Sequence, residues 1–260
     1  MFRCVINLDS SVDRWIKFQE EQKRIGLEFE RISAVYGRDL TDEQLAAVSK
    51  PRGVGYVYPM TPPEYGCFLS HRKAWQRIVE SGERWGAIVE DDVYLADELS
   101  DLLSSDDWLP EDADVVQIWS AALKIRIKGS PVPLKNGYQL VKQCKPSSFG
   151  TVGYLISREA AQRALDGSQR MNCPVDYYLF SPWFPFVRRN QVFRLSIRPL
   201  ALTSAPSEIG LRKKRQFKRP ILRQLNPVRW FGQIRISFGK MFSTPACGCS
   251  KSFPLPTATG

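Results

Sequence analysis

Residues 85–89 form a continuous apolar run that ends at three consecutive acids, Glu90, Asp91 and Asp92. A strand with apolar side chains on both faces has to be covered on both faces, which is typical of parallel or mixed sheets packed between helices. Residues 114–119 repeat the apolar pattern. The chain is therefore expected to fold as an α/β sandwich, in which helices cover both faces of a mixed, mainly parallel sheet.

Other segments alternate between strand-like and helix-like patterns. Further strands are expected at residues 4–8, 28–32, 138–141, 151–156 and 192–197, and helices are expected to start at Ser10, Thr41, Thr61 and Ser157. Thr61 is followed by two prolines and then by Glu64, which combines an N-cap hydroxyl, proline in the first turn and an acid three residues after the cap. This combination predicts the longest helix, running to about residue 80.

The net charge of +10 lies entirely in the last 60 residues. Residues 201–260 hold 11 basic side chains and one acid, Glu208, so 11 − 1 = +10, while the first 200 residues hold 26 of each sign. A hydrophobic content of 43% is too high for a disordered chain. We expect a globular body over residues 1–210, large enough for one core, and a basic tail over residues 211–260.

The basic tail mixes Lys and Arg with Trp, Phe and Leu, and Pro220 and Pro227 prevent one uninterrupted helix. Short amphipathic pieces of this composition are typical of an anchor on an anionic membrane surface, here through residues 211–240. Nucleic-acid binding through the same charges is the alternative, but phosphate binding alone does not require the large apolar side chains. A solvated tail without a partner remains open.

The N-terminal apolar run is interrupted by Asn7 and Asp9 before a secretory hydrophobic region could form, and no segment reaches the ~18 apolar residues of a membrane-spanning helix. Six cysteines are too sparse for a disulfide scaffold, so we expect reduced thiols. These features predict a cytoplasmic protein that lies peripherally on the inner face of the cell membrane.

The acidic triplet follows the carboxyl end of an expected strand, where open α/β sheets bind their ligands. Hard oxygen ligands suit Mg²⁺ or Mn²⁺, which one or two carboxylates commonly hold together with substrate phosphates. Along a strand, residues 90 and 92 point the same way, so Glu90 and Asp92 are the expected metal ligands. A solvated acidic turn is the alternative interpretation.

Seven motifs follow one another along the chain: residues 5–9 with Arg14, then residues 34–37, 64–71, 88–93, 150–157, 174–176 and 207–209. In this ordered set the sequence resembles glycosyltransferase family 25, the family of lipooligosaccharide and lipopolysaccharide galactosyltransferases. This resemblance implies a GT-A-like (Rossmann-like) fold and a UDP-hexose donor, with UDP-galactose as the usual one. It further implies a lipid-linked oligosaccharide acceptor and Mn²⁺ or Mg²⁺ bridging the donor diphosphate.

The resemblance also assigns roles to single residues. Donor-binding candidates are Asn7, Asp9, Arg14, His71, Glu90 and Asp91, the metal ligands are Glu90 and Asp92, and Asp176 is the first candidate for the general base of an inverting transfer. Arg14 could instead be a surface residue, His71 a structural residue and Asp176 a helix cap; Glu64 and Glu208 are other base candidates. No histidine follows residue 71 to add a late metal ligand.

Two other functions compete with the transferase interpretation. One is a nucleic-acid-binding protein that uses the basic tail, and the other is a transferase-like fold that serves only as a sugar-nucleotide-binding module. The acidic triplet, the Ser70-His71 pair and the Pro-x-Asp motif ending at Asp176 favour the enzyme.

Overall fold

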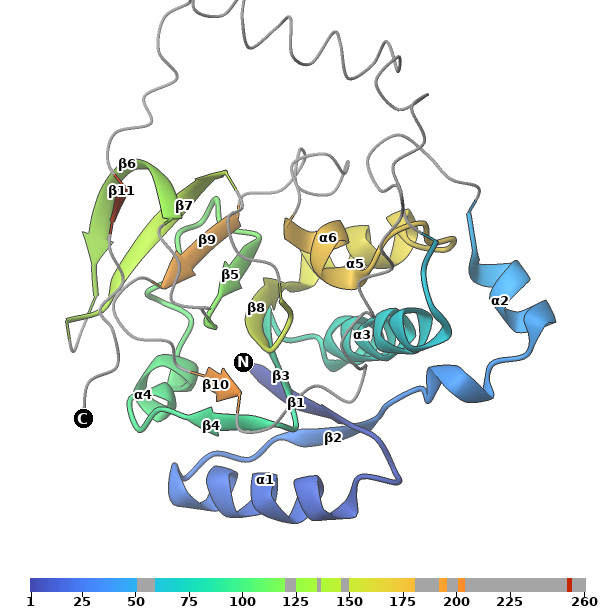
Figure 1. The fold of residues 1–260 in the computed structure, drawn as a ribbon. Helices are drawn as coiled ribbons and strands as arrows, with labels where there is room; N and C mark the ends of the chain where they lie inside the picture. The colour runs from blue at the N-terminus through green and yellow to red at the C-terminus, as the bar shows by residue number, and fades with distance from the viewer. Residues whose placement is uncertain are drawn as a thin grey trace, which may run out of the picture.

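The structure is a computed structural model, and it describes residues 1–50, 59–119, 125–134, 137–145, 150–180, 192–195, 201–203 and 252–253. Its main sheet consists of β1 (Phe2–Asn7), β2 (Glu30–Ser33), β3 (Trp85–Glu90), β5 (Val115–Gln117), β6 (Ile125–Pro133), β7 (Gln139–Lys145), β8 (Gly153–Ser157), β9 (Val192–Leu195) and β11 (Ser252–Phe253). The nine strands lie in the order β11-β6-β7-β9-β5-β8-β3-β1-β2 (Figure 1). A separate pair is formed by β4 (Val93–Leu95) and β10 (Ala201–Thr203).

Strand directions confirm a mixed sheet with a mainly parallel core. β1 pairs in parallel with both β2 and β3, and β5 pairs in parallel with β9. β8 lies between β3 and β5 and is antiparallel to both, so β2, β1, β3, β5 and β9 all run in one direction. Beyond β9 the sheet continues with antiparallel strands β7, β6 and β11, of which β6 and β11 were not expected from the sequence.

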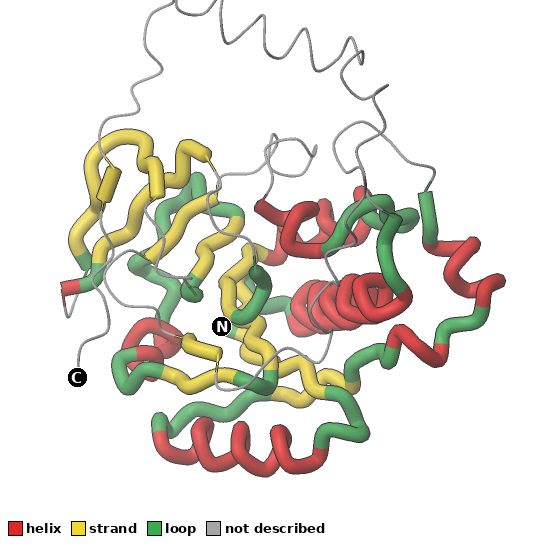
Figure 2. The backbone as a smooth tube through the Cα atoms, in the orientation of Figure 1, coloured by secondary structure: helices red, strands yellow, loops and turns green. Residues whose placement is uncertain are grey.

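Helices cover both faces of this sheet. They are α1 (Val12–Arg24), α2 (Asp42–Val48), α3 (Pro62–Ser81), α4 (Leu99–Ser104), α5 (Arg158–Gly167) and α6 (Val175–Phe180), with a short 3₁₀ helix, η1, at Gly37–Asp39. Side chains alternate along the strands, so Ile88 packs into the core cluster formed with α3, α5 and α6, while its neighbours Ala87 and Val89 pack into the cluster formed with α1 and α4. Figure 2 shows the helices around the sheet, and the predicted sandwich is confirmed.

Hydroxyl side chains cap three of the expected helices. Thr41 and Thr61 each form a capping box, and the Ser157 hydroxyl accepts the Ala160 N–H at 3.1 Å. The first helix differs from its prediction, because it begins at Val12 with Ser11 as N-cap and without a side-chain cap bond. Local residue patterns therefore located α1, α2, α3 and α5, though not always their first residue, whereas α4 was not expected.

No helix among the described residues has the length and apolar character needed to cross a bilayer. The expected amphipathic pieces of the basic tail lie outside the described residues, as does Glu208. Cys4, Cys67 and Cys173 are free thiols, in agreement with the expectation of reduced cysteines at these positions.

Candidate functional site

A pocket of about 370 Å³ opens where β1, β2 and β3 end. Its walls come from the ends of these strands, from the segment 34–38 that follows β2, and from α1 and α3. The polar side chains in the wall are those of Arg14, Arg38, Cys67, Ser70, His71, Glu90, Asp91 and Asp92. The pocket thus lies at the carboxyl edge of the parallel strands, where the sequence placed the site.

Segment 34–38 is held tightly against α3. The Ser70 hydroxyl accepts the Val35 N–H at 2.8 Å and donates to the Gly66 carbonyl at 2.7 Å. A Cβ atom on Gly66 would lie 2.5 Å from the Gly37 nitrogen, and one on Gly37 would lie 2.0 Å from the Pro62 carbonyl oxygen. Only glycine at both positions allows this backbone contact, which fixes one wall of the pocket.

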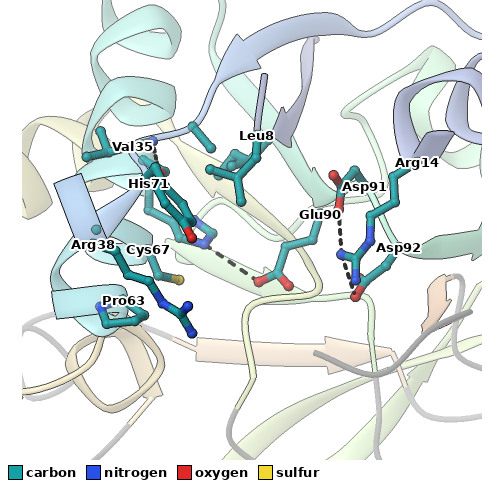
Figure 3. A pocket seen from close by; sticks show the side chains of 15 residues that line it. Leu8, Arg14, Val35, Arg38, Pro63, Cys67, His71, Glu90, Asp91 and Asp92 are labelled. Carbon is teal, nitrogen blue, oxygen red and sulfur yellow. Dashed lines mark hydrogen bonds and ion pairs between the residues drawn. The ribbon is translucent and has the colours of Figure 1, made fainter. Parts of the chain in front are cut away.

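Arg14 joins the second and third acids of the triplet. Its Nη1 donates to Asp91 Oδ1 at 3.2 Å and to Asp92 Oδ2 at 3.4 Å. The strand alternation on which the expected common direction of Glu90 and Asp92 rests does not reach Asp92, because β3 ends at Glu90. Figure 3 shows Glu90 turned toward His71, while Asp91 and Asp92 flank Arg14.

Asn7 and Asp9 occupy different environments. Asn7 is buried, and its Nδ2 donates to Asp91 Oδ2 at 2.6 Å while its Oδ1 accepts from Arg31 at 2.8 Å. Asp9 pairs with Arg31 at 2.9 Å, has a side chain 69% exposed, and does not line the pocket. Neither residue lines the pocket, but Asn7 holds Asp91 in place, whereas Asp9 contacts no acid of the triplet.

Asp92 is the least satisfied acid of the triplet. Its residue is 6% exposed, and among the described residues its Oδ1 has no hydrogen-bond partner. Burial and repulsion by Glu90 raise the pKa of Asp92 to about 6, although Arg14 partly offsets the shift. Burial also raises the pKa of Asp91, against the opposing contacts of Asn7 and Arg14. A cation at this edge would stabilise the ionised forms of Asp91 and Asp92, and so offset the effects that raise their pKa values.

Glu90 is held as an anion by its neighbours. Burial alone would raise its pKa, but interactions with His71, Thr151 and Arg14 outweigh burial and lower it. The Thr151 hydroxyl donates to Glu90 Oε1 at 2.8 Å, and His71 Nε2 lies 3.8 Å from the same oxygen.

His71 is fixed from behind by two aromatic residues. Its Nδ1 lies 2.9 Å from the Tyr154 hydroxyl, which also accepts the Trp75 Nε1–H at 2.8 Å. Burial raises the pKa of Tyr154 well above its usual range, so its hydroxyl keeps a proton to donate to Nδ1. Donation by Tyr154 to Nδ1 is the arrangement in which the ring N–H of His71 lies on Nε2, facing Glu90. His71 is thus both buried structure and pocket wall, and the two predicted alternatives coincide.

Cys67 lies among carboxylates on the α3 side of the pocket. Burial raises the pKa of its thiol well above the usual range, and the charges of Glu90, Asp176 and Glu64 raise it further. Ligand atoms of Cys67, His71 and Glu90 all lie within 4.8 Å of one another. The sequence-based set of site residues omitted Cys67, Thr151 and Tyr154, although all three belong to the motifs at residues 64–71 and 150–157.

Asp176 lies in the first turn of α6 and outside the pocket wall. Its Oδ1 accepts the Tyr177 N–H at 2.8 Å. Burial, with repulsion from Glu90 and Glu64, raises its pKa to about 6, which is suitable for a base near neutral pH. The other described base candidate, Glu64, accepts the Thr61 N–H at 2.7 Å in the capping box of α3.

Two kinds of donor could hold a metal ion here. Asp92, with its unpartnered buried oxygen, and Glu90 offer carboxylate oxygens, which suit Mg²⁺ or Mn²⁺. Cys67 and His71 add a sulfur and a nitrogen, which suit softer ions. The residues at this edge therefore fit the divalent cation that the sequence led us to expect.

Comparisons with known proteins agree with the motifs. The family profile described as Glycosyltransferase family 25 (LPS biosynthesis protein) matches residues 1–179. The lacto-N-neotetraose biosynthesis glycosyltransferase LgtB of Neisseria meningitidis is 26% identical over 189 residues, covering 69% of this chain and 68% of that protein. Procollagen galactosyltransferase 1-A of Xenopus laevis is 27% identical over 185 residues, covering 67% of this chain.

The match spans only 30% of the length of that procollagen galactosyltransferase. Among solved structures, a glycosyltransferase involved in the glycosylation of the major capsid of PBCV-1 aligns with a TM-score of 0.32 and 12% identity, covering 63% of this chain and 64% of that one.

Proposed function

Because the chain belongs to glycosyltransferase family 25, we propose that it transfers a hexose from a nucleotide sugar to a saccharide. The proposed donor is UDP-galactose, and the proposed acceptor is a lipid-linked oligosaccharide of lipooligosaccharide or lipopolysaccharide. The names of two relatives support these choices, since one acts in lacto-N-neotetraose biosynthesis and another is called a galactosyltransferase.

One observation carries the proposal. Three acids and Arg14 converge on a pocket at the carboxyl edge of β1, β2 and β3, and one buried acid oxygen there has no partner among the described residues. An acidic pocket by itself repels a diphosphate, so it needs a cation to bind one. This arrangement supports a donor that enters together with Mn²⁺ or Mg²⁺, held by Glu90 and Asp92.

The acids and the residues that contact them have proposed parts in donor binding. A bound divalent cation would neutralise charge on the departing UDP as a Lewis acid. Arg14 keeps Asp91 and Asp92 together at hydrogen-bond distance, and Asn7 fixes Asp91 from the opposite side. His71 and Thr151 hold Glu90 in its ionised form. These contacts pre-organise the acids, so little reordering is needed when the donor enters.

We assign the general base to Asp176. Inversion at the anomeric carbon requires that a base remove the proton of the attacking acceptor hydroxyl. The pKa of about 6 leaves Asp176 ionised at neutral pH while keeping it basic enough to accept that proton. The hydroxyl oxygen then bonds to the anomeric carbon as the bond to UDP breaks.

Binding of UDP provides the direct test. UDP with Mn²⁺ should raise the melting temperature, and a panel of nucleotide sugars with Mn²⁺ should show slow release of UDP, fastest from UDP-galactose. Neither assay needs the acceptor. Absence of a shift with every uridine nucleotide would rule the donor class out, whereas faster hydrolysis of UDP-glucose would change only the hexose.

The basic tail is the basis of a proposal about where in the cell the protein acts. Residues 211–240 would bind the anionic inner face of the cell membrane and keep the pocket near a lipid-linked acceptor. Their mixture of basic and large apolar side chains supports this role over nucleic-acid binding.

A further inference from the structure

Cys67 and His71 lie one turn apart on α3, at a spacing that puts both side chains on one face of the helix. Across the pocket stands Glu90 at the end of β3 (Figure 3). One ligand atom from each residue lies within 4.8 Å of the other two. Within the described ranges, no other three His, Cys, Asp or Glu side chains come together this closely.

We propose that Cys67, His71 and Glu90 form a second cation site, one that selects a borderline ion such as Zn²⁺ over Mg²⁺ or Mn²⁺. A thiolate, an imidazole and a carboxylate are all zinc ligands, and three protein ligands leave a fourth position for water or substrate. Ligand atoms around tetrahedral zinc lie roughly 3.4 to 3.8 Å apart, given bonds of about 2.0 to 2.3 Å. To close the difference, the Glu90 carboxylate, whose side chain is 30% exposed, has to turn away from its hydrogen bond with Thr151.

Electrostatics at this position favour a cation. The charges of Glu90, Asp176 and Glu64 all act on Cys67, and without a metal they oppose the formation of one more anion there. A bound divalent ion reverses that balance, and a coordinating thiol then gives up its proton to solvent. Burial is the main reason that the free thiol keeps its proton, and the negative charges of Glu90, Asp176 and Glu64 around it would attract a cation.

Tyr154 supports the imidazole ligand from behind. When Nε2 of His71 binds the ion, the ring proton moves to Nδ1, which lies 2.9 Å from the Tyr154 hydroxyl oxygen and can donate to it. A hydrogen bond to the second ring nitrogen is the usual support of a metal-bound histidine. The hydroxyl hydrogen of Tyr154 then loses His71 as its acceptor, which limits the affinity.

Glu90 belongs to both proposed cation sites, so their ions compete. Zinc bound by the trio would withdraw Glu90 from the carboxylate pair that it forms with Asp92. We therefore expect Zn²⁺ to inhibit the Mn²⁺-supported reaction. This inhibition rests on the proposed function, whereas binding of the ion to the trio does not.

Cobalt is the spectroscopic probe for the trio, because a bond between Co²⁺ and a thiolate gives a charge-transfer absorption that carboxylate and imidazole ligands do not. The full-length chain is used with Cys247→Ser and Cys249→Ser, so that the Cys-x-Cys pair of the tail cannot contribute. In this background one equivalent of Co²⁺ should produce the band, and one equivalent of Zn²⁺ should remove it.

Cys67→Ser should abolish the band and weaken Zn²⁺ binding by about 10- to 100-fold. Cys173→Ser is the matched control, since it changes another buried thiol and should retain both band and affinity. Melting temperatures verify that each variant is folded, and Cys67→Ala serves as a second variant if the serine disturbs the core. Cobalt bound without the band, or a band that survives Cys67→Ser, overturns the site.

Inhibition by Zn²⁺ is measured separately, through the release of UDP. With saturating Mn²⁺, the zinc concentration that halves UDP release should rise at least about tenfold in Cys67→Ser, with each protein compared with its own zinc-free rate. A cobalt band without any UDP release would contradict the proposed function alone. UDP release without a cobalt band would contradict the zinc site alone.

Discussion

At the scale of single residues, Asp92 is the acid of the triplet whose negative charge is least stabilised by its surroundings. Its carboxylate is buried beside Glu90 and Asp91, one of its oxygens has no partner among the described residues, and its pKa is raised to about 6. A residue in this state lowers the stability of the free protein at neutral pH. Ionisable groups that lower the stability of the free protein are common in sites that bind a charged ligand.

Asp92→Asn should have opposite effects on the free and the ligand-bound protein. Removing the buried charge should stabilise the free protein at pH 7 by about 1 kcal/mol, because the repulsion by Glu90 disappears. The rise in melting temperature with UDP and Mn²⁺ should be lost. Differential scanning fluorimetry measures both. Asp101→Asn, an exposed acid on α4, should leave both unchanged.

The raised pKa of Asp176 predicts a dependence of stability on pH. Its value of about 6 exceeds the 3.8 of an ordinary aspartate, so between these values the folded protein binds more protons than the unfolded chain. Stability from this group is complete below about pH 4 and is lost as the pH rises through 6. Relative to Asp176→Asn, the wild type should lose roughly 2 kcal/mol between pH 4 and 7, measured by denaturant unfolding.

Activity should change in the opposite direction over the same range. A base has to be ionised, so turnover should rise with pH and level off above about 6. Asp176→Asn should lower turnover by about 10²- to 10⁴-fold. Asp166→Asn, an exposed acid on α5, is the control for both experiments. A variant at position 176 with wild-type turnover would assign the base to another residue.

At the scale of elements, the contact between α3 and segment 34–38 leaves no room for a larger side chain at Gly66. A methyl group on Gly66 would lie 2.5 Å from the Gly37 nitrogen and 2.6 Å from the Val35 carbonyl oxygen. Both obstacles are backbone atoms, so the segment has to move as a whole. The hydrogen bond between Val35 and Ser70 opposes that movement.

Gly66→Ala should therefore destabilise the protein by about 2 kcal/mol or more, although alanine is the better helix former. Donor binding should weaken with it, because the displaced segment forms a pocket wall. Gly26→Ala is the matched control: its φ is +67°, but a Cβ there meets no atom within 4 Å. It should cost only about 1 to 2 kcal/mol of backbone strain and leave UDP binding unchanged. Urea unfolding and UDP titration compare the two.

Elements with local signals could be predicted from the sequence, and those that depend on distant contacts could not. The continuous apolar run identified β3 as a doubly covered strand, and the hydroxyl residues identified the starts of α2, α3 and α5. The direction of the Asp92 side chain could not be predicted, because it depends on a contact with Arg14, 78 residues away in sequence. The exposure of Val12 and Ile16 on α1 could not be predicted either, since amphipathic spacing does not show how much of a helix is covered.

At the scale of the whole molecule, the surplus of positive charge lies in the basic tail. Replacing Arg212, Lys213, Lys214 and Arg215 by glutamine removes four positive charges from the proposed membrane anchor. At about 1 kcal/mol for each basic residue, binding to anionic liposomes should fall on the order of a thousandfold. Flotation assays measure the loss, and hydrolysis of the donor in solution should be unchanged.

This variant is a sharper test than truncation after Gly210, because truncation also removes β11, which pairs with β6 at the sheet edge. Liposomes without anionic lipid are the reference. Undiminished binding of the glutamine variant to anionic liposomes would contradict the electrostatic role of the tail.

The position of β1 inside the sheet has a consequence for synthesis on the ribosome. Of the described strands β1 is made first, yet its two neighbours are β2 and β3, and β3 ends at residue 90, which is 90 − 7 = 83 residues after the end of β1. At a synthesis rate of about 5 to 20 residues per second, β3, the second neighbour of β1, is completed on the order of 4 to 17 s after β1. Thr151, whose hydroxyl donates to Glu90, is synthesised later still. The nascent chain thus carries an apolar strand with an open edge for several seconds, and chaperones that bind extended apolar segments have that interval in which to act.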